Sequence, residues 1–164
     1  GRSLAVRLGR EFIDLDALTP IEMNEPDVTT AFAHQGEAAF RNAERQCLAR
    51  ALNGRGQIIA LGGGTPTAPG VAELIAQART RGEVATVYLR AGAPTLRDRL
   101  KAADNSHRPS LTGRGLLEEV VELLAKRDPL YLRLADQIVE LESLPAGTAS
   151  AAVVDHLATI FASR

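Results

Sequence analysis

The stretch from Gln57 to Leu61 is apolar at almost every position and runs directly into three glycines, Gly62, Gly63 and Gly64. A strand with one face in water alternates polar and apolar residues, whereas an unbroken apolar strand is typical of a parallel sheet covered on both faces. Strands of this kind alternate with helices along the chain. The stretch therefore predicts an α/β fold, with helices on both sides of a parallel sheet.

The rest of the chain alternates in the expected way. Period-two or apolar runs predict further strands at 12–16, 84–89 and 137–141. Helical spacing of apolar residues predicts a first helix that is already under way at residue 1 and stops at Gly9. It predicts further helices at 27–52 with a break at Gly36, and at 70–81, 94–102, 116–127 and 149–162. The polar stretch 104–115 has the composition of a mobile loop. With 164 residues and no internal repeat, the chain is expected to form one domain.

Charge and composition exclude several classes of protein. Lysine and arginine number 19 against 20 acidic residues, so no global positive field exists to hold nucleic acid or an anionic membrane. No apolar run approaches the roughly 18 residues of a membrane span. The single cysteine, Cys47, excludes an internal disulfide framework and sits on an apolar helical face, where a core position is expected. We expect a cytoplasmic protein without a nucleic-acid or membrane partner.

Two predicted strand ends carry unusual residues. Asp14 and Asp16 would share one face of a strand, where they could hold magnesium or accept a proton from a hydroxyl. The alternative is a solvated strand end whose aspartate caps a turn. The glycine triplet could present bare backbone to a ligand, or it could be a plain flexible turn. Because ligands of α/β sheets gather at the carboxyl ends of strands, both ends are candidate sites.

Several arginines could bind an anionic substrate, because the planar guanidinium matches carboxylate and phosphate oxygens two at a time. The candidates are Arg41, Arg99, Arg108, Arg114 and Arg127. For each of them alone, a solvated surface position is the simpler reading. Arg41 has more support, because Glu44 lies three residues further along the same helix and could orient it. The alternative for that pair is an ordinary ion pair on a helix surface.

Taken in order, five segments resemble shikimate kinase, and the resemblance spans nearly the whole chain. The segments are Gly1-Arg2-x-Leu4-Ala5-x-x-Leu8-Gly9-x-x-Phe12-Ile13-Asp14-Leu15-Asp16, Gly36-Glu37-x-x-Phe40-Arg41-x-x-Glu44, Ala60-Leu61-Gly62-Gly63-Gly64-Thr65, Arg108-Pro109-x-Leu111 and Arg127-x-Pro129-Leu130-Tyr131. The resemblance implies a three-layer α/β/α fold of the P-loop kinase type. It also implies transfer of the ATP γ-phosphoryl group to the 3-hydroxyl of shikimate, in aromatic amino-acid biosynthesis, by a monomer.

The resemblance assigns substrate roles position by position. Asp16 would bind the shikimate hydroxyls and act as general base. Arg41 and Arg127 would clamp the shikimate carboxylate, and Glu44 would brace Arg41. The triplet Gly62–Gly64 would form the floor of the substrate site. Such a division of roles suits phosphoryl transfer, which needs positioning of the substrates and charge neutralisation more than covalent catalysis.

The remaining roles implied by the resemblance concern the ring, the metal and the nucleotide. Phe32 and Phe40 would press against the apolar face of the shikimate ring. Asp14 would lie near magnesium and reach it through water. Arg108 would lie in a lid at 104–115 and reach the ATP phosphates, while Arg99 would pack near the adenine.

The family's chain begins with a strand followed by G-x-x-x-x-G-K-[ST], and this motif does not occur in the sequence. We therefore expect an N-terminally truncated kinase domain, inactive by itself, without the strand that is first and central in the family's sheet. The absence of that strand would leave a gap between the strands at 57–61 and 84–89. The alternative is a kinase-derived module that binds shikimate or regulates without turnover. A third hypothesis, a relative that acts on another small polyol or nucleotide, is less favoured, because the arginines and the glycine triplet occur together.

Overall fold

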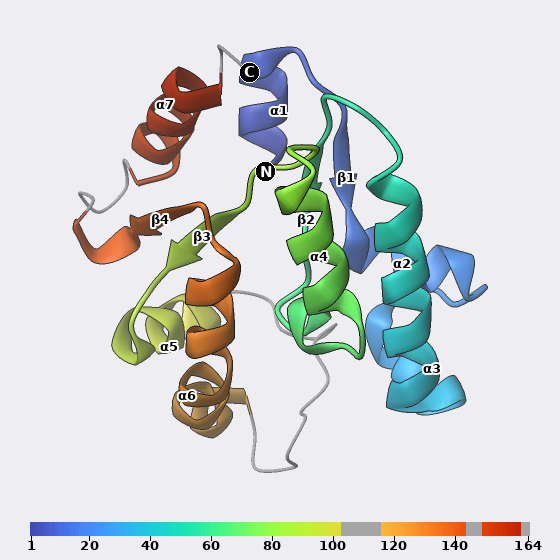
Figure 1. The fold of residues 1–164 in the computed structure, drawn as a ribbon. Coiled ribbons are helices and arrows are strands. Elements are labelled where there is room, and N and C mark those ends of the chain that lie inside the picture. Colours follow the sequence, from blue (N-terminus) through green and yellow to red (C-terminus); the bar gives the residue numbers. More distant parts are fainter. Residues whose placement is uncertain (103–115, 144–148, 162–164) are drawn as a thin grey trace.

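The computed structural model describes residues 1–102, 116–143 and 149–161, so the predicted lid and Arg108 lie outside the described residues. The described elements are α1 (Arg2–Leu8), β1 (Phe12–Asp14), α2 (Leu15–Glu22), α3 (Val28–Ala51), β2 (Ile58–Ala60), α4 (Val71–Thr80), β3 (Val87–Arg90), α5 (Ala93–Ala102), α6 (Leu116–Leu134), β4 (Gln137–Glu140) and α7 (Ala149–Phe161), with short 3-10 turns η1 (Thr65–Thr67) and η2 (Leu141–Ser143). Strands and helices alternate, as predicted. Figure 1 shows α2 beside α3 and α5 beside α6, in different parts of the molecule.

The strands form two parallel pairs. β1 pairs with β2, with Asp14 opposite Ala60, and β3 pairs with β4. Within the described residues β2 and β3 are not hydrogen-bonded to each other, so the strands form two short sheets, with the gap between β2 and β3 that the resemblance implied. The prediction that β2 is fully buried is wrong, because all three of its residues are partly exposed. A strand with a partner on only one side receives less cover than a strand inside a continuous sheet.

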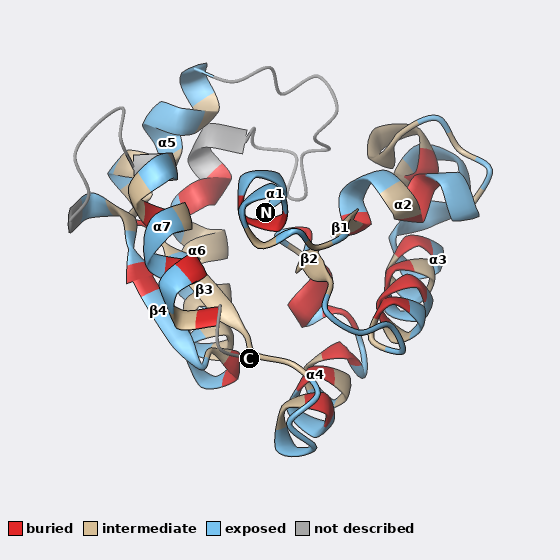
Figure 2. Ribbon diagram, turned by 90° about the horizontal axis from the view of Figure 1, so that it is seen from above, coloured by how far each residue is buried: buried red, intermediate tan, exposed pale blue. Residues whose placement is uncertain are grey.

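Two clusters of buried apolar residues hold the helices against the strands. The first core cluster consists of Leu15, Cys47, Leu48, Ala68, Val71, Ile75 and Leu134. The second core cluster consists of Leu4, Val139, Val153, Leu157, Ala158 and Phe161. Cys47 is buried, as predicted, and burial raises the pKa of its thiol. The buried residues of α3 lie along one side of the helix, as helical periodicity requires (Figure 2).

Several element boundaries follow from local chemistry. α1 ends at Gly9, whose positive φ of 62° closes the helix, and α3 is kinked at Gly36, as predicted. α6 continues through Pro129 to Leu134, past the predicted end at residue 127. The strand predicted at 12–16 ends at Asp14, and residues 15–22 form a helix that the sequence patterns did not predict. No helix in the described ranges is both long enough and apolar enough to cross a membrane.

Candidate functional site

The glycine triplet follows β2 and lies beside the start of α2. Because Asp14 pairs with Ala60 across the two parallel strands, the residues two positions further on, Asp16 and Gly62, come next to each other. A Cβ atom on Gly62 would collide with the Asp16 carboxylate and would lie 3.1 Å from Oγ1 of Thr65. The missing side chain of Gly62 therefore gives the Asp16 carboxylate its place against the backbone.

The guanidinium of Arg41 lies over the last glycine of the triplet. A Cβ atom on Gly64 would lie 2.5 Å from Nη2 of Arg41. Nη1 of Arg41 donates to Glu44 Oε2 at 2.5 Å, and the Glu44 residue is only 1% exposed. The hydroxyl of Thr65 donates to the other oxygen of Glu44 at 2.6 Å. Glu44 therefore joins α3 to the end of the triplet and orients Arg41, as its spacing predicted.

Two aromatic rings line the other side of Arg41. Its guanidinium carbon lies 5.3 Å from the ring centroid of Phe32 and 5.7 Å from that of Phe40. The two rings are tilted against each other, with their centroids 4.7 Å apart, and Phe40 is 1% exposed. A cation beside aromatic faces gains electrostatic attraction, so the rings help to hold the guanidinium in place.

The last turns of α6 bring two further side chains to the triplet. Nη1 of Arg127 lies 3.8 Å from the position of a Cβ atom on Gly63. The hydroxyl of Tyr131 donates to the carbonyl oxygen of Gly63. Burial raises the pKa of Tyr131, which keeps the phenol protonated as a donor. Asp16, Arg41 and Arg127, which come from three different helices, thus all lie at three consecutive glycines.

Tyr131 and Thr65 were not predicted as site residues. Tyr131 belongs to the segment that carried the resemblance, and it lies four residues after Arg127, so helical spacing places both on one face of α6. Thr65 directly follows the triplet, but sequence spacing gives no sign that it bonds to Glu44, which is 21 residues away. Tyr131 could have been found from helical periodicity, whereas the role of Thr65 becomes visible only in the folded structure.

The predicted pairing of Asp14 and Asp16 on one face of a strand is wrong. Asp14 is the N-cap of α2, and its carboxylate accepts a hydrogen bond from the Asp16 N–H at 3.1 Å, while Asp16 lies in the first turn of the helix. The capping alternative therefore describes Asp14, because a carboxylate satisfies an otherwise unpaired N–H at a helix start. The two carboxylates still lie near the carboxyl ends of β1 and β2.

Magnesium takes six oxygen ligands and commonly receives only one or two of them from carboxylates, with water and phosphate oxygens as the rest. Within the described residues no group of three histidine, cysteine, aspartate or glutamate side chains could hold a metal ion. Asp14 and Asp16 fit as one or two oxygen donors to a magnesium ion that also binds phosphate. They do not fit a site made of protein ligands alone.

The nucleotide side is less complete in the described residues. Arg99 is exposed on α5, where its charge acts on the Glu142 carboxylate. The pKa of Glu142 is lowered, first by the hydrogen bond from the Gly92 N–H. Arg108 lies outside the described residues. The structure therefore brings together the residues that were predicted to bind shikimate. Arg108, which was predicted to reach the ATP phosphates, is not among the residues that it describes.

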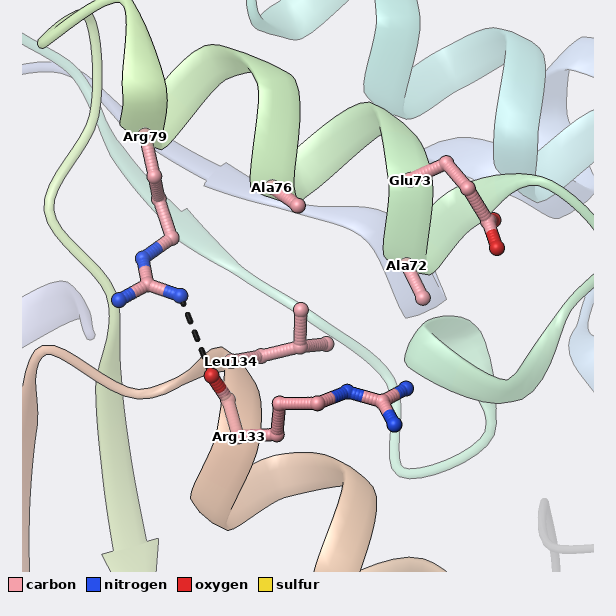
Figure 3. Close-up of a pocket in the computed structure, with 6 residues that line it drawn as sticks. All are labelled: Ala72, Glu73, Ala76, Arg79, Arg133 and Leu134. Atoms are coloured by element: carbon pink, nitrogen blue, oxygen red, sulfur yellow. Dashed lines mark hydrogen bonds between the residues drawn. The ribbon is translucent and has the colours of Figure 1, made fainter.

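A cavity of about 240 Å³ lies elsewhere, between α4 and the end of α6 (Figure 3). Its lining residues are Ala72, Glu73, Ala76, Arg79, Arg133 and Leu134. Nη1 of Arg79 donates to the Arg133 carbonyl at 3.2 Å across it. None of the predicted site residues lines this cavity, so it is not part of the candidate site.

Comparison with known proteins gives consistent matches over almost the whole chain. The family model for shikimate kinase matches residues 1–158. A shikimate kinase from Stenotrophomonas maltophilia (strain K279a) is 41% identical over 159 residues, which cover 97% of this chain and 84% of that protein. Another, from Mycobacterium avium (strain 104), is 34% identical over 164 residues, which cover 100% of this chain and 88% of that protein.

A solved structure shows the same fold with its ligand. The shikimate kinase from Acinetobacter baumannii, in complex with shikimate, matches with a TM-score of 0.82 at 27% identity, covering 100% of this chain and 86% of that chain. The likeness confirms the predicted three-layer α/β/α, P-loop kinase-like fold. From the family model and the relatives together, the chain belongs to the shikimate kinase family of transferases.

Proposed function

We propose that this chain binds shikimate over the glycine triplet, as the phosphoryl acceptor of a kinase. The shikimate carboxylate lies between the guanidinium groups of Arg41 and Arg127, and a ring hydroxyl is held by Asp16. The observation that carries this proposal is the convergence of three helices on Gly62–Gly64. Two cations and one anion beside bare backbone match a small polyol that carries one carboxylate.

The apolar face of the ring is proposed to rest against Phe32, which is partly exposed, while the buried Phe40 packs behind Phe32 and supports it. Gly63 is proposed to form the floor, because it has no side chain to fill the space over the backbone. Glu44 stays buried below Arg41 and keeps the fork of the guanidinium fixed. The protein thereby fixes the ring by its carboxylate at one end and by its hydroxyls at the other.

At the reacting end, Asp16 is proposed to accept the proton of the 3-hydroxyl as that oxygen becomes a nucleophile. ATP with Mg²⁺ supplies the phosphoryl group when bound, with Asp14 as a magnesium contact through water and with Arg99 and Arg108 on the nucleotide side. The sequence contains no G-x-x-x-x-G-K-[ST] motif. The side chains named here therefore account for the binding of shikimate, the phosphoryl acceptor. We propose that they act within one monomeric domain.

The second candidate function is a shikimate-binding or regulatory module without turnover. One observation favours it. Asp16, Arg41 and Arg127 all lie at the glycine triplet, whereas the sequence lacks the glycine-lysine motif that cradles ATP phosphates. Both functions require shikimate binding, and they differ in whether a parent protein with the glycine-lysine motif transfers the phosphoryl group.

Calorimetric titration with shikimate tests the shared claim. The wild-type chain is expected to bind, and Arg127→Met is expected to weaken binding by about a hundredfold, because a charge-assisted pair with the carboxylate is lost. Arg133→Met is the matched control, since it removes an exposed arginine from the same helix and is expected to leave binding unchanged. Absence of wild-type binding, or equal losses in both variants, would contradict the proposal.

A coupled assay for ADP, with ATP, Mg²⁺ and shikimate, tests the expectation that these 164 residues alone do not turn over. Shikimate-dependent ADP formation would contradict both the inactive kinase domain and the binding module. When the chain binds shikimate without forming ADP, the coding sequence upstream of Gly1 separates the two: an in-frame strand and G-x-x-x-x-G-K-[ST] motif support the kinase, and their absence supports the module.

A further inference from the structure

The stretch of α6 that reaches the triplet contains a weak point in the helix. Arg127 and Tyr131 flank Pro129, which lies inside the helix. Proline has no N–H to donate to the carbonyl four residues earlier, and its ring crowds that carbonyl. The helical hydrogen bonds alone therefore fix this turn less firmly than an uninterrupted helix would, although its side chains have to be placed accurately against Gly63.

Asp128 ties the same turn to β3. Its two carboxylate oxygens accept from Nε and Nη2 of Arg90, each at 2.9 Å, which is a two-pronged ion pair. The hydroxyl of Tyr88 donates to the same carboxylate at 3.0 Å. The side chain of Asp128 is only 18% exposed, so solvent weakens these bonds little. The hydrogen bonds from Arg90 are the main reason that the pKa of Asp128 is lowered.

The contact continues from β3 back to the candidate site. The ring of Tyr88 packs edge-on against the ring of Tyr131, with centroids 5.3 Å apart. Tyr131 in turn donates to the Gly63 carbonyl. Asp128 therefore lies in a continuous set of contacts that runs from Arg90 on the strand to the floor of the site.

We propose that Asp128 is a positioning residue, which fixes the rotation of α6 against β3 and thereby holds Arg127 and Tyr131 at the glycine triplet. The inference rests on the proposed function, because it gives Arg127 the shikimate carboxylate as its ligand. Successive residues of a helix are turned by about 100°. A carboxylate fixed on β3 therefore sets the direction in which the neighbouring Arg127 leaves the helix.

The test compares Asp128→Asn with Glu140→Gln in the whole chain. Glu140 also pairs with Arg90, at 3.0 Å from Nη1, but it lies on β4 rather than on α6. Each variant thus removes one ionic partner of the same arginine, and only the first changes a residue of α6. Calorimetry with shikimate measures the affinity, and amide hydrogen exchange measures the order of residues 125–134, with α4 as the internal reference.

Asp128→Asn is expected to weaken shikimate binding about tenfold and to speed exchange in 125–134 but not in α4. Glu140→Gln is expected to change neither. Wild-type affinity in Asp128→Asn would overturn the proposal, even with faster exchange, because the ion pair would then only stabilise the fold. A wild-type chain that does not bind shikimate would contradict the proposed function itself, and hydrogen exchange would still show whether Asp128 orders this turn.

Discussion

At the scale of single residues, Arg41 shows how a partly buried cation is kept in one orientation. Glu44 binds it from within α3, the rings of Phe32 and Phe40 flank it, and the backbone of Gly64 lies directly beneath it. Removing a charge from water is costly unless a partner and hydrogen bonds offset the loss. The Glu44 carboxylate is itself satisfied on both oxygens, by Arg41 and Thr65. The arrangement leaves the guanidinium little freedom before a ligand arrives.

Gly64→Ala tests this close approach. The new Cβ would lie 2.5 Å from Nη2 of Arg41, so the guanidinium must move away from its place above the backbone. We expect shikimate binding to weaken at least about tenfold, since a shift of about 1 Å at a positioning group is expensive. The midpoint of thermal unfolding should fall only modestly, because the shifted guanidinium bonds Glu44 less well while Thr65 still donates to the other oxygen of that carboxylate. Calorimetry and a thermal melt measure the two effects. An unchanged dissociation constant would contradict the account of Arg41.

Sequence reasoning succeeded for the residues whose partners are close along the chain. Arg41 and Glu44 are three positions apart on one helix, and this spacing alone predicts their contact. It failed for Asp14, because a short strand followed by a helix and a continued strand have nearly the same apolar pattern over five residues. The N-cap bond to Asp16 decides between them, and this bond is visible only in the structure.

At the scale of elements, a polar tie joins the end of α4 to the segment between α6 and β4. Nη2 of Arg79 lies 2.6 Å from Oδ1 of Asp136, and Nη1 donates to the Arg133 carbonyl. Asp136 also accepts from the Thr86 N–H at 2.8 Å, just before β3. The tie therefore links the helix after β2 to the starts of β3 and β4, which share no backbone ladder with β2 within the described residues.

Arg79→Met is expected to lower the free energy of unfolding by about 1 to 2 kcal/mol, because several hydrogen bonds between charged groups are lost. Urea unfolding at pH 7 measures the change. Arg81→Met is the matched control, since Arg81 lies two residues away and its ion pair among the described residues is with the exposed Glu83. That variant should leave the stability unchanged. Equal stability of Arg79→Met and wild type would show that the tie contributes nothing.

The same tie predicts a dependence of stability on pH. Burial raises the pKa of Asp136, but hydrogen bonds from Arg79 and Thr86 outweigh it, so the pKa is lowered in the folded protein. A carboxylate with a lowered pKa stabilises the fold above its unfolded pKa of about 4, and this contribution is lost as the pH falls through the folded value. Asp136→Asn should therefore lose less stability than wild type between about pH 4 and pH 2.

Unfolding in urea at several pH values would measure this difference. Parallel curves for the two proteins over that range would show that Asp136 does not contribute to acid sensitivity.

The order and kind of most elements could be predicted from sequence, but their ends and their sheet could not. The helix predicted to stop before Pro129 continues to Leu134, because side chains such as Asp128 and Tyr131 hold the turn that proline weakens. The spacing and number of apolar residues predicted parallel strands, but they did not predict which strands pair with each other. No local pattern encodes the separation of β2 from β3, which was expected only from the resemblance, because the family's sheet has a further strand between them.

At the scale of the whole molecule, the first core cluster connects the β1–β2 part to α6, and the second connects β2 to β3 and β4. In the first core cluster, Leu134 of α6 packs with residues from α2, α3 and α4. In the second core cluster, Ile58 of β2 packs with Val87 of β3 and with α7 residues. Apolar burial therefore couples the two halves of the molecule even though their strands do not pair. This coupling implies that neither half has a separate core.

We expect unfolding to be a single cooperative transition. Both tyrosines, Tyr88 and Tyr131, lie in the β3–α6 part of the molecule, and the sequence has no tryptophan, so tyrosine fluorescence reports on that part. Far-ultraviolet circular dichroism reports on all helices. Urea transitions followed by the two signals should have the same midpoint. Two separated midpoints would show that the strand pairs fold independently.

The central claim is that Asp16, Arg41 and Arg127 meet around one small acidic polyol. A crystal structure of this chain with shikimate tests it most directly. The account predicts the carboxylate within hydrogen-bond distance of both guanidinium groups and a ring hydroxyl on Asp16, with the ring above Gly63. Shikimate bound elsewhere, or bound here with its carboxylate turned away from both arginines, would contradict the account.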